Sequence, residues 1–169
     1  MATPLPRDPI ADARRNWENN GWAEEAAPMA AITAIMRTQQ ILLARIELAL
    51  KPFGLTFARY ELLALLSFAR NGSLPMKKAS TLLQVHPTSI TNAVDRLQEA
   101  GLVRRSPHPT DGRTTLVELT AEGRTLAKRS TAALNAEVFG ASGFGQEDID
   151  QLIRILGNFR RNAGDFIGP

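Results

Sequence analysis

Apolar residues recur at helical spacing along the first long hydrophobic stretch of the chain, from Met29 to about Leu50. The positions that share this stripe are Ile32, Ile35, Met36, Leu43, Ile46 and Leu50. Pro52 and Gly54 follow, and neither residue continues a helix readily. The pattern therefore predicts one major helix that ends near residue 50.

Two shorter helices are predicted after it. Thr56 can cap the first, because its hydroxyl can accept hydrogen bonds from the free amides of a first helical turn. The turn sequence Asn71-Gly72 ends that helix, and Pro75, whose fixed φ suits a first turn, starts the next. The residues predicted to be buried are Tyr60, Leu63, Ala64 and Phe68 in the first helix and Ala79, Leu82 and Leu83 in the second.

The segment VHPTSITNAVDRL, from Val85 to Leu97, predicts a further helix that starts at His86-Pro87. Its predicted buried side consists of Ile90, Ala93, Val94 and Leu97. The opposite side begins with hydroxyl and amide groups and ends with carboxylates, which phosphate would repel, so only the first half could approach a nucleic acid. A helix-turn-helix recognition helix docks in this way, with its first residues on base edges. An ordinary surface helix with an N-cap is the alternative.

The sequence LVRRSPHPTDGRTTLVELT predicts two strands around a basic tip, Leu102 to Arg105 and Thr114 to Leu119. Prolines at 107 and 109 cannot donate to a strand ladder, so an irregular projecting loop is expected. Asp111 and Arg113 are two residues apart, a spacing that lets the carboxylate orient the guanidinium toward a narrow minor groove. A helix, turn, helix and basic hairpin together predict a winged helix. Alone, Asp111-Gly112 would indicate only a turn.

The sequence HPTSITNAVDRLQEAGLVRR, followed by DGRTTLVELT with its Asp-x-Arg element, resembles the MarR family of bacterial transcriptional regulators from about residue 30 onward. The resemblance implies a winged-helix homodimer that binds pseudo-palindromic operators, usually represses, and releases DNA when a small, often phenolic or aromatic, molecule binds. It also implies which residues contact double-stranded DNA. These are Pro87, Thr88, Ser89, Thr91, Asn92 and Arg96 on the helix, with Arg105, Asp111 and Arg113 in the hairpin.

The two last predicted helices need an apolar partner. Thr120 can cap an alanine-rich helix that contains Leu126, Leu134 and Val138. The final helix, QEDIDQLIRILGNFRR, carries an apolar stripe with acidic residues first and basic residues last, as the helix dipole favours. A bundle within one chain would satisfy both helices, but a two-fold operator with half-sites about 34 to 36 Å apart favours a homodimer. Trp17 and Trp22 are expected to pack the leading segment onto this region.

Composition narrows the function. The chain of 169 residues has no cysteine, two histidines and a net charge of +3, with basic residues concentrated between Arg70 and Arg113. Solvated surface lysines would explain a basic stretch, and a polyanion-binding surface is the functional reading. No signal peptide or membrane-spanning run is apparent, so a cytoplasmic protein without membrane contact is expected. No catalytic motif, metal-ligand spacing or cofactor fingerprint occurs, and we predict that the chain is not an enzyme.

The sequence thus predicts a mainly α (α+β) fold. Residues 1–28 form an extension, residues 29–54 and 120–169 a helical dimerisation region from both chain ends, and residues 55–119 a winged helix-turn-helix DNA-binding region. The predicted effector site comprises Met36, Gln40, Phe57, Arg59 and Tyr60, although Phe57 and Tyr60 would equally suit the core and Arg59 the surface. A winged-helix module that binds protein instead of DNA is the alternative function.

Overall fold

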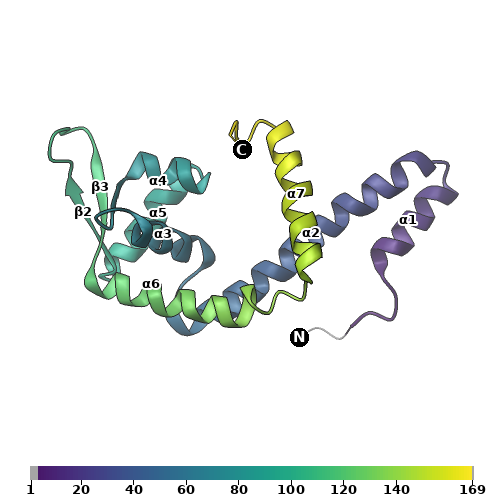
Figure 1. Ribbon diagram of the computed structural model, residues 1–169, viewed down its shortest axis with the longest axis horizontal. Coiled ribbons are helices and arrows are strands. Elements are labelled where there is room, and N and C mark those ends of the chain that lie inside the picture. Colours follow the sequence, from purple (N-terminus) through teal and green to yellow (C-terminus); the bar gives the residue numbers. More distant parts are fainter. Residues whose placement is uncertain (1–3, 169) are drawn as a thin grey trace.

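The computed structural model describes residues 4–168, so the ends of the predicted extension and of the predicted dimerisation region lie outside the described residues. The chain is mainly helical, and its three short strands come from the middle of the sequence and form one small sheet (Figure 1). In chain order the elements are α1 (Pro9–Asn19), α2 (Ala23–Leu50), a 3-10 turn (Lys51–Phe53), α3 (Phe57–Phe68), β1 (Ser73–Pro75), α4 (Met76–Leu83), α5 (Pro87–Glu99), β2 (Val103–Pro107), β3 (Thr115–Leu119), α6 (Ala121–Leu134), a π-helical turn (Asn135–Phe139) and α7 (Gln146–Asn162). The predicted mainly α fold with a winged helix is confirmed.

The sheet has three antiparallel strands in the order β1-β3-β2, with β3 in the middle. The two strands of the predicted hairpin pair from Val103 with Leu119 to Pro107 with Thr115. Pro107 is accommodated because β2 is an edge strand, where a missing amide donor leaves no central partner unpaired. Strand β1, which pairs Leu74 with Val117, was not predicted, because three residues are too short to show an alternating pattern.

The N-terminal region is more regular than the sequence analysis predicted. α2 begins at Ala23, six residues before Met29, and continues through Pro28. The predicted extension contains α1, capped by the Asp8 carboxylate, which accepts from the Ile10 amide at 3.0 Å. α1 folds back along α2, and the pair projects away from the sheet (Figure 1). Within the protomer the Trp17 and Trp22 rings contact each other edge to face, with centroids 5.4 Å apart. Their expected packing onto the dimerisation region stays a prediction.

The core lies where α3, α5 and α6 meet the sheet and the end of α2. Its largest fully buried side chains are Leu50, Leu62, Leu63, Leu66, Val94, Leu97, Val103, Val117 and Leu134. Two side chains predicted to be buried are exposed, Phe68 at 81% and Leu82 at 53%. Phe68 is the last residue of its helix, where the apolar stripe has passed beyond the neighbouring elements. This core holds the helix-turn-helix unit and the hairpin as one rigid lobe.

Among the described residues, no helix combines the length and apolar character that a membrane span requires. The last helix contributes nothing to the core of the protomer. No residue of α7 is buried, although the helix carries the apolar residues Ile153, Ile155 and Phe159. Several apolar residues in the N-terminal half of α2 are exposed in the same way, including Ile32, Ile35 and Met36. The single protomer thus leaves apolar faces uncovered on α2 and α7.

Candidate DNA-binding surface

The turn between α4 and α5 is closed by side chains that fix the start of α5. The Ser80 hydroxyl donates to the Val85 carbonyl at 2.7 Å, and the Val85 amide donates back to the Ser80 carbonyl at 3.2 Å. His86 is the N-cap, with Nδ1 accepting from the Thr88 amide at 3.2 Å. Pro87 occupies the first helical position, as predicted, because its missing amide would have no intrahelical partner there. The position of α5 is therefore set from its first residue.

α5 divides into the two faces that its sequence predicts. Ile90, Val94 and Leu97 are buried against the lobe, with Ala93 half-buried beside them. The predicted DNA-contacting side chains of the helix are all exposed: Pro87, Thr88, Ser89, Thr91, Asn92 and Arg96. The Thr91 hydroxyl donates to the Pro87 carbonyl at 3.0 Å, whereas within the described chain no hydrogen bond engages the side chain of Asn92. The first half of the helix thus presents free donors and acceptors.

Arg96 and Arg105 differ in how far they are committed to other groups. The Arg96 guanidinium pairs with Glu99 at 3.0 Å, but both side chains are well exposed, so this pair is easily exchanged for a phosphate. Arg105 is only 28% exposed and lies between two partners on α5: its guanidinium donates to Asp95 at 2.5 Å and to Gln98 at 3.1 Å. Arg105 therefore joins β2 to α5, a role that the sequence analysis missed because residues 95 and 105 lie on different elements.

At the base of the wing, defined as residues 103–119, Glu118 ties the two strands together. Its carboxylate accepts from the Ser106 hydroxyl at 2.5 Å and from the Arg104 guanidinium at 2.7 Å. The Ser106 bond, followed by the Arg104 bond, holds the pKa of Glu118 below its ordinary value, because both stabilise the charged carboxylate. The wing strands are thus joined by side chains as well as by the backbone ladder.

At the wing tip, the predicted contact between the Asp111 carboxylate and the Arg113 guanidinium is wrong. Asp111 instead accepts from the Arg113 backbone amide at 3.0 Å and from the Thr114 hydroxyl at 2.7 Å. These two bonds, the hydroxyl first, keep the pKa of Asp111 below its ordinary value. An aspartate followed by a turn bonds its own backbone more readily than a mobile side chain. Asp111 therefore shapes the turn, and the exposed Arg113 side chain extends from it.

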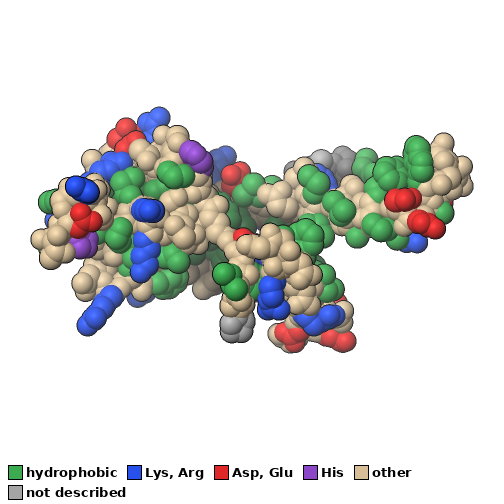
Figure 2. Space-filling model, turned by 90° about the horizontal axis from the view of Figure 1, so that it is seen from above, with side chains coloured by type: hydrophobic (Ala, Val, Ile, Leu, Met, Phe, Trp, Pro, Cys, Tyr) green, Lys and Arg blue, Asp and Glu red, His purple; other side chains and the backbone are tan. Residues whose placement is uncertain are grey.

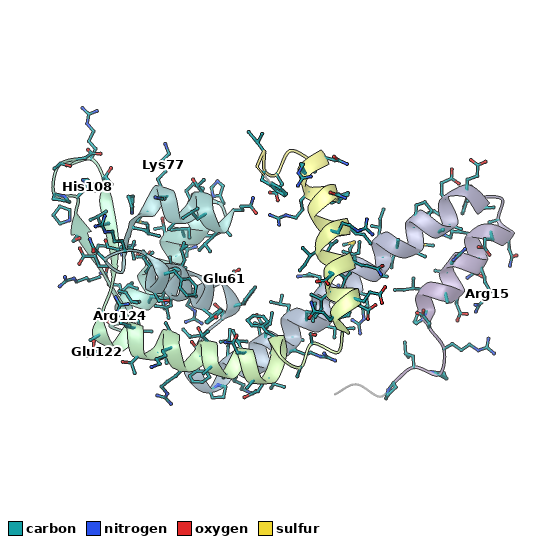
Figure 3. All side chains as sticks on the ribbon, viewed as in Figure 1. Arg15, Glu61, Lys77, His108, Glu122 and Arg124 are labelled. Carbon is teal, nitrogen blue, oxygen red and sulfur yellow. The ribbon has the colours of Figure 1, made fainter. Side chains whose placement is uncertain are left out.

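The wing and the start of α5 are accessible from one side of the lobe. Figure 3 places His108 on the wing and Lys77, in the first turn of α4, at the same upper edge of the lobe. The face shown in Figure 2 carries both histidine side chains, one in the wing and one at the start of α5, among several basic side chains. A polyanion that approached this face would meet both elements together.

The five predicted effector residues are not gathered in one place. Phe57 lines a cavity of about 510 Å³ between α2 and α7. The Tyr60 ring stacks on the Phe57 ring with their centroids 6.3 Å apart, and the Tyr60 hydroxyl is hydrogen-bonded to the Thr131 hydroxyl at 3.1 Å. Arg59 donates to its own helix cap at Thr56, while Met36 and Gln40 are exposed on α2 outside the cavity lining. The cavity is lined by Ala34, Ile35, Thr38, Gln39, Leu42, Leu43, Ile46, Phe57, Phe144, Leu152 and Leu156. Of the five predicted residues, only Phe57 lines the cavity. Met36 and Gln40 each follow a lining residue of α2, and one step along a helix turns a side chain to a different face.

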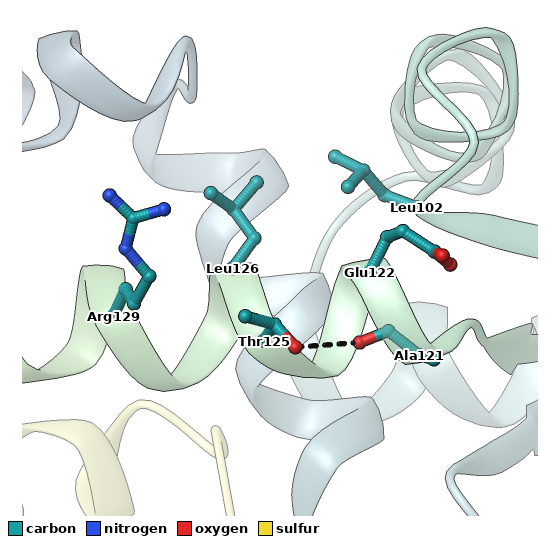
Figure 4. Close-up of a pocket in the computed structure, with 6 residues that line it drawn as sticks. All are labelled: Leu102, Ala121, Glu122, Thr125, Leu126 and Arg129. Carbon is teal, nitrogen blue, oxygen red and sulfur yellow. Dashed lines mark hydrogen bonds between the residues drawn. The ribbon is translucent and has the colours of Figure 1, made fainter.

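A shallower hollow of about 360 Å³ lies beside the start of α6 (Figure 4). Arg129, Glu122 and Leu126 line it, and its Thr125 hydroxyl is already bonded to the Ala121 carbonyl at 3.0 Å. The Thr125 hydroxyl is therefore not available to a ligand, and the charged groups of the lining are those of Glu122 and Arg129. Among the described residues, no group of three His, Asp or Glu side chains is placed to hold a metal ion.

Comparison with known proteins agrees with this geometry. A model of the MarR family matches residues 53–114. The uncharacterized HTH-type transcriptional regulator YhbI of Bacillus subtilis is 32% identical, over 70% of this chain and 73% of its own. Sco5413, a MarR family transcriptional regulator from Streptomyces coelicolor, is 47% identical with a TM-score of 0.76, over 84% of this chain and 99% of its own. CouR of Rhodococcus jostii, solved with p-coumaroyl-CoA, is 26% identical with a TM-score of 0.64, over 75% of this chain and 88% of its own.

Transcriptional regulators of this kind are not enzymes, which confirms the prediction that the chain is not one. The matched region contains the helix-turn-helix and most of the wing, and Sco5413 aligns along most of both chains. The chain belongs to the MarR family of DNA-binding transcriptional regulators.

Proposed function

We propose that the protein is a repressor that binds pseudo-palindromic operators as a homodimer and is released by a small neutral aromatic molecule. The observation that carries this proposal is the exposed first half of α5, with its hydroxyl and amide side chains, in the same lobe as a wing whose tip is also exposed. In this arrangement Thr88, Ser89 and Asn92 reach base edges in the major groove, while Arg113 reaches the adjacent minor groove. A regulator of this kind works in the cytoplasm.

A second copy of the chain is the partner that best suits the uncovered faces of α2 and α7. Ile32, Ile35 and Met36 on α2 are 53 to 62% exposed, and Ile153 and Phe159 on α7 are 68% and 71% exposed. Apolar side chains also run along the projecting α1–α2 pair (Figure 2). A two-fold dimer would bury such faces and present two recognition helices to successive major grooves. This assigns residues 29–54 and 120–169 to dimerisation and 55–119 to DNA binding.

The cavity between α2 and α7 is the site that we assign to the effector. Its lining is almost entirely apolar, with Thr38 and Gln39 as the polar exceptions and no lysine or arginine. A buried carboxylate would lose its hydration there without gaining a counter-charge, so an uncharged aromatic molecule with one hydrogen-bonding group fits better. Phe57 offers a ring for stacking and Gln39 an amide for a phenolic hydroxyl.

The deciding experiment is selection of bound fragments from a random DNA pool, followed by titration of the selected duplex at several salt concentrations. We expect a two-fold symmetric sequence and an affinity that falls steeply with salt, with a log-log slope of about 0.9 per phosphate neutralised. A flat salt response with no selected sequence would instead favour a winged-helix module that binds protein. Repeating the titration with 2-naphthol, a neutral two-ring phenol, tests release; equal affinity with and without saturating 2-naphthol would exclude it as an effector.

A further inference from the structure

The residues that follow α7 reach the turn of the helix-turn-helix. Asp165 accepts a hydrogen bond from the Gln84 side-chain amide at 2.6 Å, across 81 positions of sequence. Gln84 is the C-cap of α4 and lies two residues before His86, the N-cap of α5. This contact joins the end of α7 directly to the element that positions the recognition helix.

Asp165 is held firmly on the last turn of α7. Its second carboxylate oxygen accepts from the Arg160 guanidinium at 2.6 Å, and its amide donates to the Arg160 carbonyl at 3.0 Å. Gly164, with φ of +77°, makes the reversal that brings the chain back. The Phe166 ring then lies beneath the Arg160 and Arg161 guanidinium groups, at 5.3 and 5.5 Å. Asp165 therefore moves with α7.

Gln84 is located where a movement of Asp165 would be transmitted to the start of α5. Its φ is +53°, and no other non-glycine residue in the described chain has a positive φ. Its backbone amide donates to the Thr81 carbonyl at 3.2 Å, and Val85 and the N-cap residue His86 follow immediately. A pull on Gln84 thus acts on the short rigid turn that carries Pro87 and the first half of α5.

Within the protomer, few contacts other than that of Asp165 tie α7 to the lobe. None of its residues is buried in the protomer, and it faces α2 across the cavity through Leu152 and Leu156. A molecule in that cavity contacts α7 on one side and α2 on the other. Displacement of α7 would therefore change the strain on the Asp165–Gln84 contact.

We propose that the contact between Asp165 and Gln84 forms a latch. Both are positioning residues: through them α7 sets the placement of α5, and through them occupancy of the cavity affects the position of the DNA-reading helix. The regulatory part of the latch rests on the function proposed above, because it uses that cavity and that DNA-binding surface. The latch itself does not depend on either one: it predicts that the α4–α5 turn becomes less ordered when Asp165 is removed.

The sign of the effect of Asp165→Ala separates the latch from simple electrostatics. Removal of a negative charge should leave DNA affinity unchanged or raise it, whereas loss of the latch should lower affinity for the selected operator about 3- to 10-fold, as expected for the net contribution of one solvent-accessible hydrogen bond. The matched control is Asp150→Ala, which removes the same charge from an exposed position on α7 whose bond is to Gln146 in the same helix. Equal affinities for the two variants would overturn the latch.

A swap of the two groups gives a stricter test. Gln84→Glu places two carboxylates against each other and should weaken operator binding, while adding Asp165→Asn restores a donor opposite the new acceptor and should recover affinity to within about twofold of the wild type. Gln84→Glu combined with Asp150→Asn has the same net charge but no restored contact. If that pair recovers affinity equally, the carboxylate introduced by Gln84→Glu acts through its charge near DNA and not through Asp165.

Amide hydrogen exchange of residues 84–91 provides a measurement that needs no DNA or effector. Asp165→Ala should raise the exchange rate of this segment and Asp150→Ala should not; unchanged exchange in Asp165→Ala overturns the latch. The effect of saturating 2-naphthol on operator affinity should also be smaller in Asp165→Ala than in Asp150→Ala. A wild type that selects no operator would contradict the proposed function alone, because the exchange measurement still decides the latch.

Discussion

Asn92 has the side chain best suited to reading a base on the exposed face of α5. Its amide can donate to and accept from one adenine edge, and no other described group in the protein engages it. We expect Asn92→Ala to weaken operator binding by about 1 to 3 kcal/mol and to relax the preference at one base pair. Fluorescence anisotropy with the selected duplex and its single-base variants measures both effects. Asn158→Ala, an exposed amide on α7, is the control; an equal response to both substitutions would contradict base reading.

Arg113 is proposed to contribute charge in place of base-edge reading. The turn that Asp111 fixes leaves the guanidinium exposed at the wing tip, where a narrow minor groove has strongly negative potential. Arg113→Ala should reduce affinity for all duplexes and lower the salt slope by about one phosphate contact. Titrations at four salt concentrations check this, with Arg154→Ala on α7 as a charge-matched control. An unchanged slope would mean that the wing tip does not reach the phosphates or the groove.

Among the elements, the wing is the one whose stability should respond to pH. The lowered pKa of Glu118 means that its contacts stabilise the folded state above the ordinary carboxyl value of 4.5, and that this contribution disappears as pH falls through the lower folded-state pKa. We expect Glu118→Gln to lower the free energy of unfolding at pH 7 by no more than about 1 kcal/mol, because the pair is near the surface.

Chemical denaturation of the wild type and Glu118→Gln from pH 7 to pH 3 measures this difference. The gap between the two proteins should narrow below pH 4.5, where the wild-type carboxylate begins to lose its charge advantage. Glu137→Gln, an exposed glutamate of the π-helical turn, provides the comparison. A gap that stays constant with pH would show that Glu118 acts through packing and not through its charge.

For the whole molecule, assembly is the property that the single protomer leaves incomplete. Ile153 and Phe159 are exposed on α7, and a dimer interface would bury them. Ile153→Glu with Phe159→Glu should convert a two-chain species into a one-chain species and reduce operator affinity at least tenfold, because one recognition helix then reads only a half-site. Light scattering gives the mass, and helical content from circular dichroism shows that the variant remains folded.

A matched substitution on a different helix controls for added charge. Lys128→Glu changes an exposed residue of α6, so it should leave the two-chain mass unchanged. If the wild type itself has the mass of one chain at micromolar concentration, the proposed homodimer is wrong, and the apolar faces of α2 and α7 must be covered by another protein.

The sequence by itself determined most of the secondary structure of the winged-helix lobe and the two-faced character of α5. Ile90, Val94 and Leu97 recur with the helical period, and Pro87 marks the helix start, because both signals are local and need no distant partner. For the same reason the exposure of Thr88 and Asn92 followed directly from the burial of the opposite face. Short β1 escaped prediction, since its only reason to be a strand is its pairing with β3.

Only the tertiary structure decided which side chains meet. Arg105 with Asp95, Asp165 with Gln84, and the cavity between Phe57 and Leu156 each bring together residues from separate elements, and no sequence spacing encodes those distances. The turn geometry likewise places the Asp111 carboxylate against the Arg113 backbone amide and not against the Arg113 guanidinium. Local periodicity sets which face of an element is buried, but the packing of elements against one another sets the contacts across those faces.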